Sequence, residues 1–309
     1  MKRSPGAEPG LDTVASVVQR LAVLLAAGVV PASGWGYLAE GSDAGVVPLV
    51  AAAAAGGRPV SEAIVVAVER EPGADEQAWR GLAAAWQVAT DAGTSLAPSL
   101  RQFASSLRDL AQTRRDLSVA LAGPLATARM VMILPVVGVL FGLALGFDTL
   151  GTLFTTVPGW VCLVLGVGLM VIARRWNGKL VAGARPTLLT PGLSLDLMAI
   201  AVSGGASLPR ASAAVDEART RCGLADDGGA AAVEAVLSLS RRAGVPAAEL
   251  LRSEAEEARR DARSAGQAAA ARLAVTLMLP LGLCILPAFM LLGVAPLLIA
   301  IVASTVSLV

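Results

Sequence analysis

Few side chains in this 309-residue chain could do acid–base or nucleophilic chemistry, because it contains no histidine. That absence excludes every Ser-His and Cys-His arrangement and removes the commonest general base. Carboxylates remain, and a carboxylate-dependent membrane hydrolase would have Asp148 and the pair Asp226 and Asp227 as its candidates. Lone acids in loops are more often caps or turn residues, which favours a structural role for all of them.

The cysteines and the glycine-rich segments do not predict a cofactor site. Cys162 and Cys284 lie in apolar stretches and Cys222 in a Gly/Asp-rich region, so neither a metal-ligand spacing nor a disulfide framework is visible. The sequence also lacks a G-x-x-x-x-G-K-[ST] phosphate loop. We therefore predict no metal, no cofactor and no catalytic residue, and any energy that the protein uses must come from a partner.

The composition indicates a membrane protein. Hydrophobic residues make up 55% of the chain and the mean hydropathy is +0.67, whereas soluble globular proteins are roughly 45–50% apolar. The net charge of +1 hides an uneven distribution in which basic residues gather beside the apolar runs. This pattern is typical of contact with membrane lipids and does not predict a nucleic-acid partner.

Three apolar stretches could cross a bilayer, which needs about 20 residues. They are 130–147, 153–173 and 273–292. We expect Gly293 to Pro296 to break the last helix, and 297–309 is too short to cross comfortably. Because the stretches lack ionisable residues, an ion-coupled transporter is disfavoured. A small-solute transporter or channel remains the alternative, with Thr155, Thr156 and Thr276 as its polar candidates.

Charge predicts the orientation of these stretches. Basic residues lie before the first, after the second and before the third: Arg114, Arg115 and Arg129; Arg174, Arg175, Lys179 and Arg185; and Arg259, Arg260, Arg263 and Arg272. Because cytoplasmic flanks carry the excess of basic residues, both polar blocks are predicted to be cytoplasmic. We expect a multi-pass protein of the cell membrane with most of its mass in the cytoplasm.

Both polar blocks are predicted to be helical bundles, giving an all-α membrane protein. The predicted divisions are a first domain at 1–129, a membrane hairpin at 130–173, a second domain at 174–272 and a membrane segment at 273–309. A recurring turn, glycine followed closely by proline, fits a helix end and the start of the next helix. Its glycines are Gly28, Gly57, Gly93, Gly205 and Gly244.

The two halves resemble each other around one of these turns. Asp91 to Arg101 matches Arg242 to Arg252 through Ala-Gly, a leucine and an arginine. Each match continues as a long charged helix into an apolar stretch that contains Leu-Pro. A duplicated helical module explains this layout, and pairs such as Glu256 with Arg260 support the exposed helix.

This order of helical domain, membrane hairpin, helical domain and final span resembles the F-domain proteins of type II secretion and type IV pilus machines. The resemblance extends from about Val14 to Leu298. The turn A-G-x-x-L-A-x-x-L at 92–100 and the closing L-P-L-G-L-C-I-L-P-A-F-M-L-L-G-V-A-P-L-L at 279–298 are most similar to the tight-adherence (Flp/Tad) pilus branch.

The resemblance implies two F-type domains in an inner-membrane platform protein that is not an enzyme. Such proteins form homo-oligomers, or hetero-oligomers with a second platform protein. They contact a cytoplasmic assembly ATPase and act on pilin subunits in the bilayer. The basic residues of the long helices would then be candidate partner contacts: Arg114, Arg115, Arg259, Arg260 and Arg263.

Overall fold

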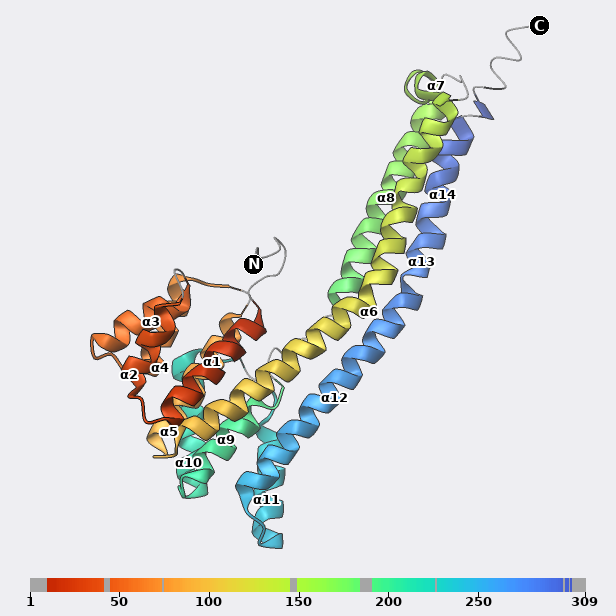
Figure 1. The fold of residues 1–309 in the computed structure, drawn as a ribbon. Coiled ribbons are helices and arrows are strands. Elements are labelled where there is room, and N and C mark those ends of the chain that lie inside the picture. The colour runs from red at the N-terminus through yellow and green to blue at the C-terminus, as the bar shows by residue number, and fades with distance from the viewer. Residues whose placement is uncertain are drawn as a thin grey trace, which may run out of the picture. The chain divides into compact units, whose positions relative to one another are not determined.

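The computed structural model describes residues 10–41, 45–73, 75–144, 149–183, 191–225, 227–296, 298–299 and 301. Helices make up its regular secondary structure, and the described residues contain no strand (Figure 1). The chain divides into two compact units. Unit 1 consists of residues 1–114 and 187–263, and unit 2 of residues 115–186 and 264–309.

Unit 1 is a bundle of short helices to which two long helices contribute their first parts. Helix α2 packs on α3, α3 on α4 and α4 on α5, while α9 and α10 both pack on α5. The helices of this unit are α1 (Leu11–Ala26), α2 (Pro31–Ala39), α3 (Val46–Ala55), α4 (Val60–Arg70), α5 (Glu76–Asp91), α9 (Leu193–Ser203), α10 (Leu208–Cys222) and α11 (Ala230–Ala243), with the first parts of α6 (Leu96–Ala144) and α12 (Ala247–Thr276).

The core of unit 1 is built around α5, whose side chains are buried almost all round. Trp35 packs against Trp79 and Trp86, with ring centroids 6.5 Å apart in each pair. A Cβ on Gly81 of α5 would lie 3.2 Å from Phe103 Cζ and 3.5 Å from Leu193 Cδ2, so α6 and α9 approach α5 closely. Small residues on α5 make this close packing possible.

One hydrophobic cluster in unit 1 includes side chains from Leu11 to Ala111 and from Leu193 to Ala255. The sequence pattern divides these segments between two domains, and the structure packs them around a single core. The reason is long-range packing: α9, an apolar helix buried on every side from Leu193 to Ala201, covers α5 from the first segment. A helix that is apolar all round needs such partners on several faces.

Each of the turn glycines has positive φ: Gly28 at 87°, Gly57 at 82°, Gly93 at 65°, Gly205 at 77° and Gly244 at 66°. At Gly93 the turn closes through Thr94 N–H donating to Ala89 O (2.9 Å). At Gly244 it closes through the glycine's own N–H donating to Ser240 O (2.9 Å). Both are left-handed helix ends, where glycine carries no Cβ penalty, and they precede the long helices α6 and α12.

Unit 2 contains the apolar helices. After the second part of α6 come α7 (Thr149–Thr155) and α8 (Val157–Gly183). The second part of α12 leads into α13 (Met278–Pro280), π-helix η1 (Leu281–Ile285), α14 (Leu286–Phe289) and π-helix η2 (Met290–Val294). Within this unit α8 packs along η1, α14 and η2. Gly138 of α6 approaches Phe289 and Gly293 closely enough to leave no room for a Cβ.

Two described segments are long and apolar enough to cross a membrane, Val157–Val181 and Ala247–Val294, and Met132–Ala144 is a shorter apolar helix. The second predicted stretch, 153–173, includes the end of α7 and the first part of α8, which begins at Val157. The chain bends at Thr156, whose Oγ1 accepts a hydrogen bond from Gly159 N (3.1 Å), and α8 begins at Val157 with Pro158 in its first turn. A proline there is favourable because its missing N–H needs no partner.

The predicted helix break from Gly293 to Pro296 is wrong. Residues 290–294 form η2, and residues 295–296 continue in helical geometry. Pro280 immediately precedes η1, and Pro287 lies in the short helix before η2. The wider π-turns follow prolines, which remove a backbone donor and interrupt the regular α-helical pattern.

Candidate functional site

A polar groove of about 480 Å³ lies in unit 1 between α6 and α12. Polar residues Gln102, Ser106, Asp109 and Thr113 line it on the α6 side. The α12 side is strongly basic and contributes Arg252, Glu256, Arg259, Arg260 and Arg263. The groove therefore contains three of the predicted partner-contact residues, and arginine is the basic residue best suited to bind carboxylates at an interface.

A buried ion pair underlies the groove. Arg259 Nη1 of α12 donates to Asp196 Oδ2 of α9 at 2.8 Å, and the two side chains are 12% and 7% exposed. Two α6 side chains also donate to the same carboxylate, Ser106 Oγ at 3.3 Å and Gln102 Nε2 at 3.5 Å. We call these four residues the Asp196 network. It ties three helices together at one carboxylate.

Burial dominates the electrostatics of this carboxylate. Loss of water raises the pKa of Asp196 above its ordinary value, while the charge and hydrogen bond of Arg259 act in the opposite direction. A void of about 20 Å³ lies beside the pair, which is room for about one water molecule. A second hydrogen bond joins α12 to α9: Arg252 Nη2 donates to Ser203 Oγ at 2.9 Å.

The predicted contact residues differ in their surroundings. Arg259 is buried in the Asp196 network, whereas Arg260 is 66% exposed and lies 3.9 Å from Glu256 and 4.0 Å from Glu257. Arg263 is exposed on the same side of the groove. Arg114 is half-buried in α6, one residue after Thr113 of the groove, and Arg115 is the first residue of unit 2.

Asp196 is the residue that sequence reasoning missed. It is the single charge within the apolar segment L-S-L-D-L-M-A-I at 193–200, and a lone acid inside a buried helix signals a partner of opposite charge. The sequence also contained a signal for the partner of Asp196, which is Arg259. Leu251 and Ala255 are fully buried, and Arg259 follows them at i+4 spacing on the same face of α12.

The acidic candidates for a hydrolase do not form a reactive group in the part of the chain that the structure describes. Asp227 accepts hydrogen bonds from Ser194 N (3.0 Å) and Ser194 Oγ (2.6 Å), so it caps the first turn of α9. Asp148 and Asp226 lie outside the described residues, as does Arg185. The described residues hold no cluster of potential metal ligands.

The cysteines are free, and Cys222 and Cys284 are buried. Burial raises the pKa of the Cys222 thiol to about 11 against the opposing charge of Arg80, so it is protonated at neutral pH and a poor nucleophile. Arg80 Nη1 itself donates to the Cys222 carbonyl at 2.8 Å. This contact joins α5 to the end of α10 and serves packing.

Comparison with protein families gives one match: residues 17–144 match the family described as Type II secretion system (T2SS), protein F. The matched segment begins within α1 and ends at the last residue of α6, and it covers less than half of the chain. The match supports the F-domain family for this segment. Comparisons with curated proteins and with solved structures gave no significant match.

Proposed function

We propose that this chain is an inner-membrane platform protein of a type II secretion or type IV pilus machine, of the tight-adherence (Flp/Tad) kind. The observation that carries the proposal is the protein F match over residues 17–144, which contains α2 to α6 in full. The platform is not an enzyme. It couples a cytoplasmic assembly ATPase to the extraction and polymerisation of pilin subunits, as a homo-oligomer or together with a second platform protein.

The long helices supply a physical route for this coupling. Helix α6 continues without interruption from the bundle of unit 1 into the apolar part of unit 2, and α12 does the same. In this proposal the apolar part of each long helix lies in the bilayer, so the same two helices carry both the bundle of unit 1 and the membrane segments. The exposed arginines of the groove, Arg260 and Arg263, are the proposed contacts for acidic side chains of the ATPase, because guanidinium groups bind carboxylates bidentately.

Cysteine accessibility tests the orientation. In a background with all native cysteines replaced by alanine, Ser253→Cys on α12 should react with an impermeant maleimide only after the membrane is opened. The exposed Ser105→Cys on α6 should behave in the same way. Labelling of either site in intact cells would place unit 1 outside the cytoplasm and overturn the platform assignment.

Co-purification tests the partner. The full-length protein, extracted in mild detergent, should retain the assembly ATPase encoded beside it, and deletion should stop pilus or pseudopilus formation while pilin accumulates in the membrane. Solute flux in liposomes, with no ATPase retained, would instead identify a transporter. Turnover of a hydrolysable substrate by the purified chain would identify an enzyme.

A further inference from the structure

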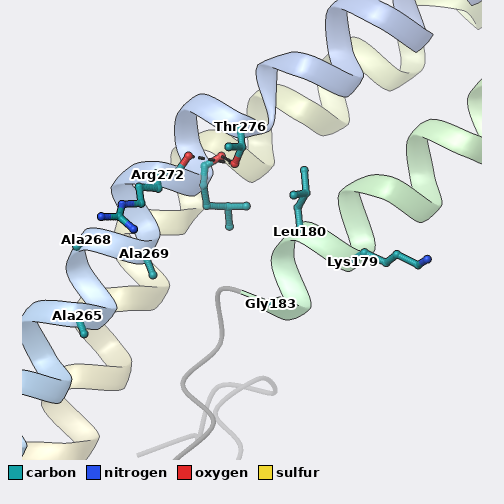
Figure 2. Close-up of a pocket in the computed structure, with 9 residues that line it drawn as sticks. Lys179, Leu180, Gly183, Ala265, Ala268, Ala269, Arg272 and Thr276 are labelled. Carbon is teal, nitrogen blue, oxygen red and sulfur yellow. Dashed lines mark hydrogen bonds between the residues drawn. The ribbon is translucent and has the colours of Figure 1, made fainter.

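The groove that opens in unit 2 does not select a polar ligand. It lies between the end of α8 and the second part of α12, where its lining includes Leu180 and small side chains such as Ala269. Figure 2 shows the Lys179 and Arg272 side chains extending away from it, on the outer sides of the two helices. The Thr276 hydroxyl donates within α12, to Arg272 O at 3.0 Å. The lining therefore suits apolar contact of any kind, and a more specific surface lies in unit 1.

The two chain segments of unit 1 repeat one arrangement of helices. Helix α1 ends two residues before Gly28 and α9 ends two residues before Gly205, and both glycines have positive φ. Helices α5 and α11 end just before Gly93 and Gly244, whose turns lead into α6 and α12. Aligning these glycines matches α1 with α9, α5 with α11 and α6 with α12.

A side-chain contact supports this alignment. It matches Gln19 of α1 with Asp196 of α9, and it matches Arg108 of α6 with Arg259 of α12. Arg108 Nη1 donates to Gln19 Oε1 at 3.5 Å. Arg259 Nη1 donates to Asp196 Oδ2 at 2.8 Å. The first segment therefore contains a hydrogen-bonded counterpart of the buried ion pair, and the match holds for contacts as well as for sequence.

Helix α9 of the second segment packs along α5 of the first. A Cβ on Gly81 of α5 would lie 3.5 Å from Leu193 Cδ2. A Cβ on Gly204, after the end of α9, would overlap the Ala92 carbonyl oxygen. These two contacts are equally far apart on the two helices and follow in the same order along the chain, so α5 and α9 are parallel.

The register of this contact pairs two buried residues whose counterparts are exposed. It sets Ile200 of α9 beside Val88 of α5, and these side chains are 7% and 0% exposed. The alignment matches Ile200 with Val23 of α1 and Val88 with Leu239 of α11, which are 53% and 46% exposed. Single exposed apolar side chains are common. These two, however, hold the positions that pack together elsewhere in the same unit.

The faces around Val23 and Leu239 are left open within the chain. Helix α1 packs on α2 and α5, and α11 packs on α9. The exposed residues of each face recur at three- or four-residue spacing: Arg20, Val23 and Ala27 on α1 and its cap, and Ala235, Leu239 and Ala243 on α11. Each chain therefore carries both halves of a second contact of the α9–α5 kind.

We propose that α1 of one copy of this chain packs on α11 of a second copy, parallel to it and with Val23 beside Leu239. The partner is a second copy because the same chain presents both matching faces. A contact between two different surfaces closes as a ring, or as a dimer when two copies exchange it. The interface deepens the proposed function by naming the surfaces of its homo-oligomer, and its role in a platform rests on that proposed function.

Two replacements make this interface looser than the contact within the chain. Ala27 stands where α9 is followed by Gly204, and a Cβ at that position overlaps the facing turn in the α9–α5 contact. Arg20 stands where α9 has Leu197, so its charged end must reach solvent while its stem lies along α11. Such an interface suits association between copies that fold separately.

Disulfide formation between differently tagged chains tests the contact and its register. With the native cysteines replaced by alanine, a Val23→Cys chain and a Leu239→Cys chain are co-expressed, and their membranes are oxidised with copper phenanthroline. We expect a disulfide between the two tags, because the paired Cα atoms would lie within about 7 Å. Glu234→Cys is the matched control for Leu239→Cys, since it is exposed on another side of α11. Equal yields at positions 234 and 239, or no link at 239, would overturn the proposal.

A charge exchange tests the same pair without a covalent link. Leu239→Glu should weaken self-association of the purified full-length protein about tenfold, while its melting temperature stays unchanged because the side chain is exposed. Val23→Lys/Leu239→Glu should recover most of the loss, since opposite charges then meet between copies. Tyr37→Glu, at an exposed position of α2 outside both faces, should have no effect. Loss without recovery in the double variant would overturn the pairing.

The two levels of the proposal fail separately. A chain that retains the assembly ATPase but shows no link between its own copies would overturn this interface and leave the proposed function in place. A chain that forms the Val23–Leu239 link but supports no pilus or pseudopilus and retains no ATPase would overturn the proposed function alone.

Discussion

Arg259 Nη1 lies 2.8 Å from Asp196 Oδ2, and this pair joins α12 to α9 inside unit 1 with both side chains nearly excluded from solvent. Ser106 and Gln102 extend the contact to α6. The two long helices that continue into unit 2 are thus tied to one buried carboxylate. Two arginines that follow on α12, Arg260 and Arg263, remain exposed. Arg259 therefore holds α12 against α9, whereas Arg260 and Arg263 lie outside the Asp196 network and are the residues that we propose to contact a partner.

Removing one member of the pair should destabilise unit 1. Asp196→Ala leaves the Arg259 charge buried without its partner, which costs about 3–5 kcal/mol. The double variant Asp196→Leu/Arg259→Met removes both charges and should recover much of that loss. Thermal unfolding in detergent measures both. The exposed pair Arg221 and Glu217, 2.6 Å apart, is the control, and its loss should change stability by less than about 1 kcal/mol. Equal effects at the two pairs would contradict a buried anchor.

The titration of Asp196 should give a specific pH dependence. Burial raises its folded pKa above the ordinary value of 3.8, so between 3.8 and the raised pKa the folded state binds more protons than the unfolded state. Stability from this group is therefore greatest at low pH and falls as pH rises through that window. The variant Asp196→Asn has no titrating group at this position and is therefore the reference. The difference in melting temperature between the original chain and Asp196→Asn should decrease with rising pH over this interval and then level off. An increase over the interval would contradict the direction of the shift.

The sequence predicted those features of the fold that depend on residues close together in the chain. The helical pattern, the apolar stretches and the positions of Gly93 and Gly244 before the two long helices depend on periodicity and turn residues close in the chain. The shared core of unit 1 depends instead on α9 packing against α5, more than a hundred residues apart in sequence. The sequence did not separate Arg259 from the neighbouring arginines of α12. What distinguishes Arg259 is its contact with Asp196, which becomes visible only in the folded chain.

Close packing between the two segments of unit 1 predicts a sensitive glycine. A Cβ on Gly204, at the end of α9, would overlap the carbonyl oxygen of Ala92 in the turn after α5. Gly204→Ala should therefore push α9 away from this turn and destabilise unit 1 by about 1–3 kcal/mol. Gly36→Ala is the matched control, since it lies inside helix α2 with open space around it and should be neutral or slightly stabilising. Limited proteolysis compares the two, and equal resistance would show that the contact is dispensable.

The turns before the long helices should depend on left-handed backbone geometry. Gly93 and Gly244 have φ of 65° and 66°, with open space around each, so the cost of a side chain there is conformational. We expect stability to decrease in the order Gly, Asn, Ala, Val at both positions, with alanine costing about 1–2 kcal/mol. Melting temperatures of the purified variants measure this order. Valine tolerated without loss would show that the turns can adopt another geometry.

The last prediction separates anchoring from coupling at the exposed arginines. Lysine keeps the positive charge, and with it membrane topology, but lacks the planar fork that binds a carboxylate bidentately. Arg260→Lys/Arg263→Lys should therefore leave insertion and abundance unchanged while it reduces ATPase co-purification and pilus assembly severalfold. Arg241→Lys/Arg242→Lys on α11 is the matched control, because these arginines are also exposed and lie outside the groove. Extending the change to Arg114 and Arg115 tests the corresponding residues of α6. Normal assembly by the combined lysine variant would assign these residues to membrane electrostatics and place the ATPase contact on another surface of the bundle.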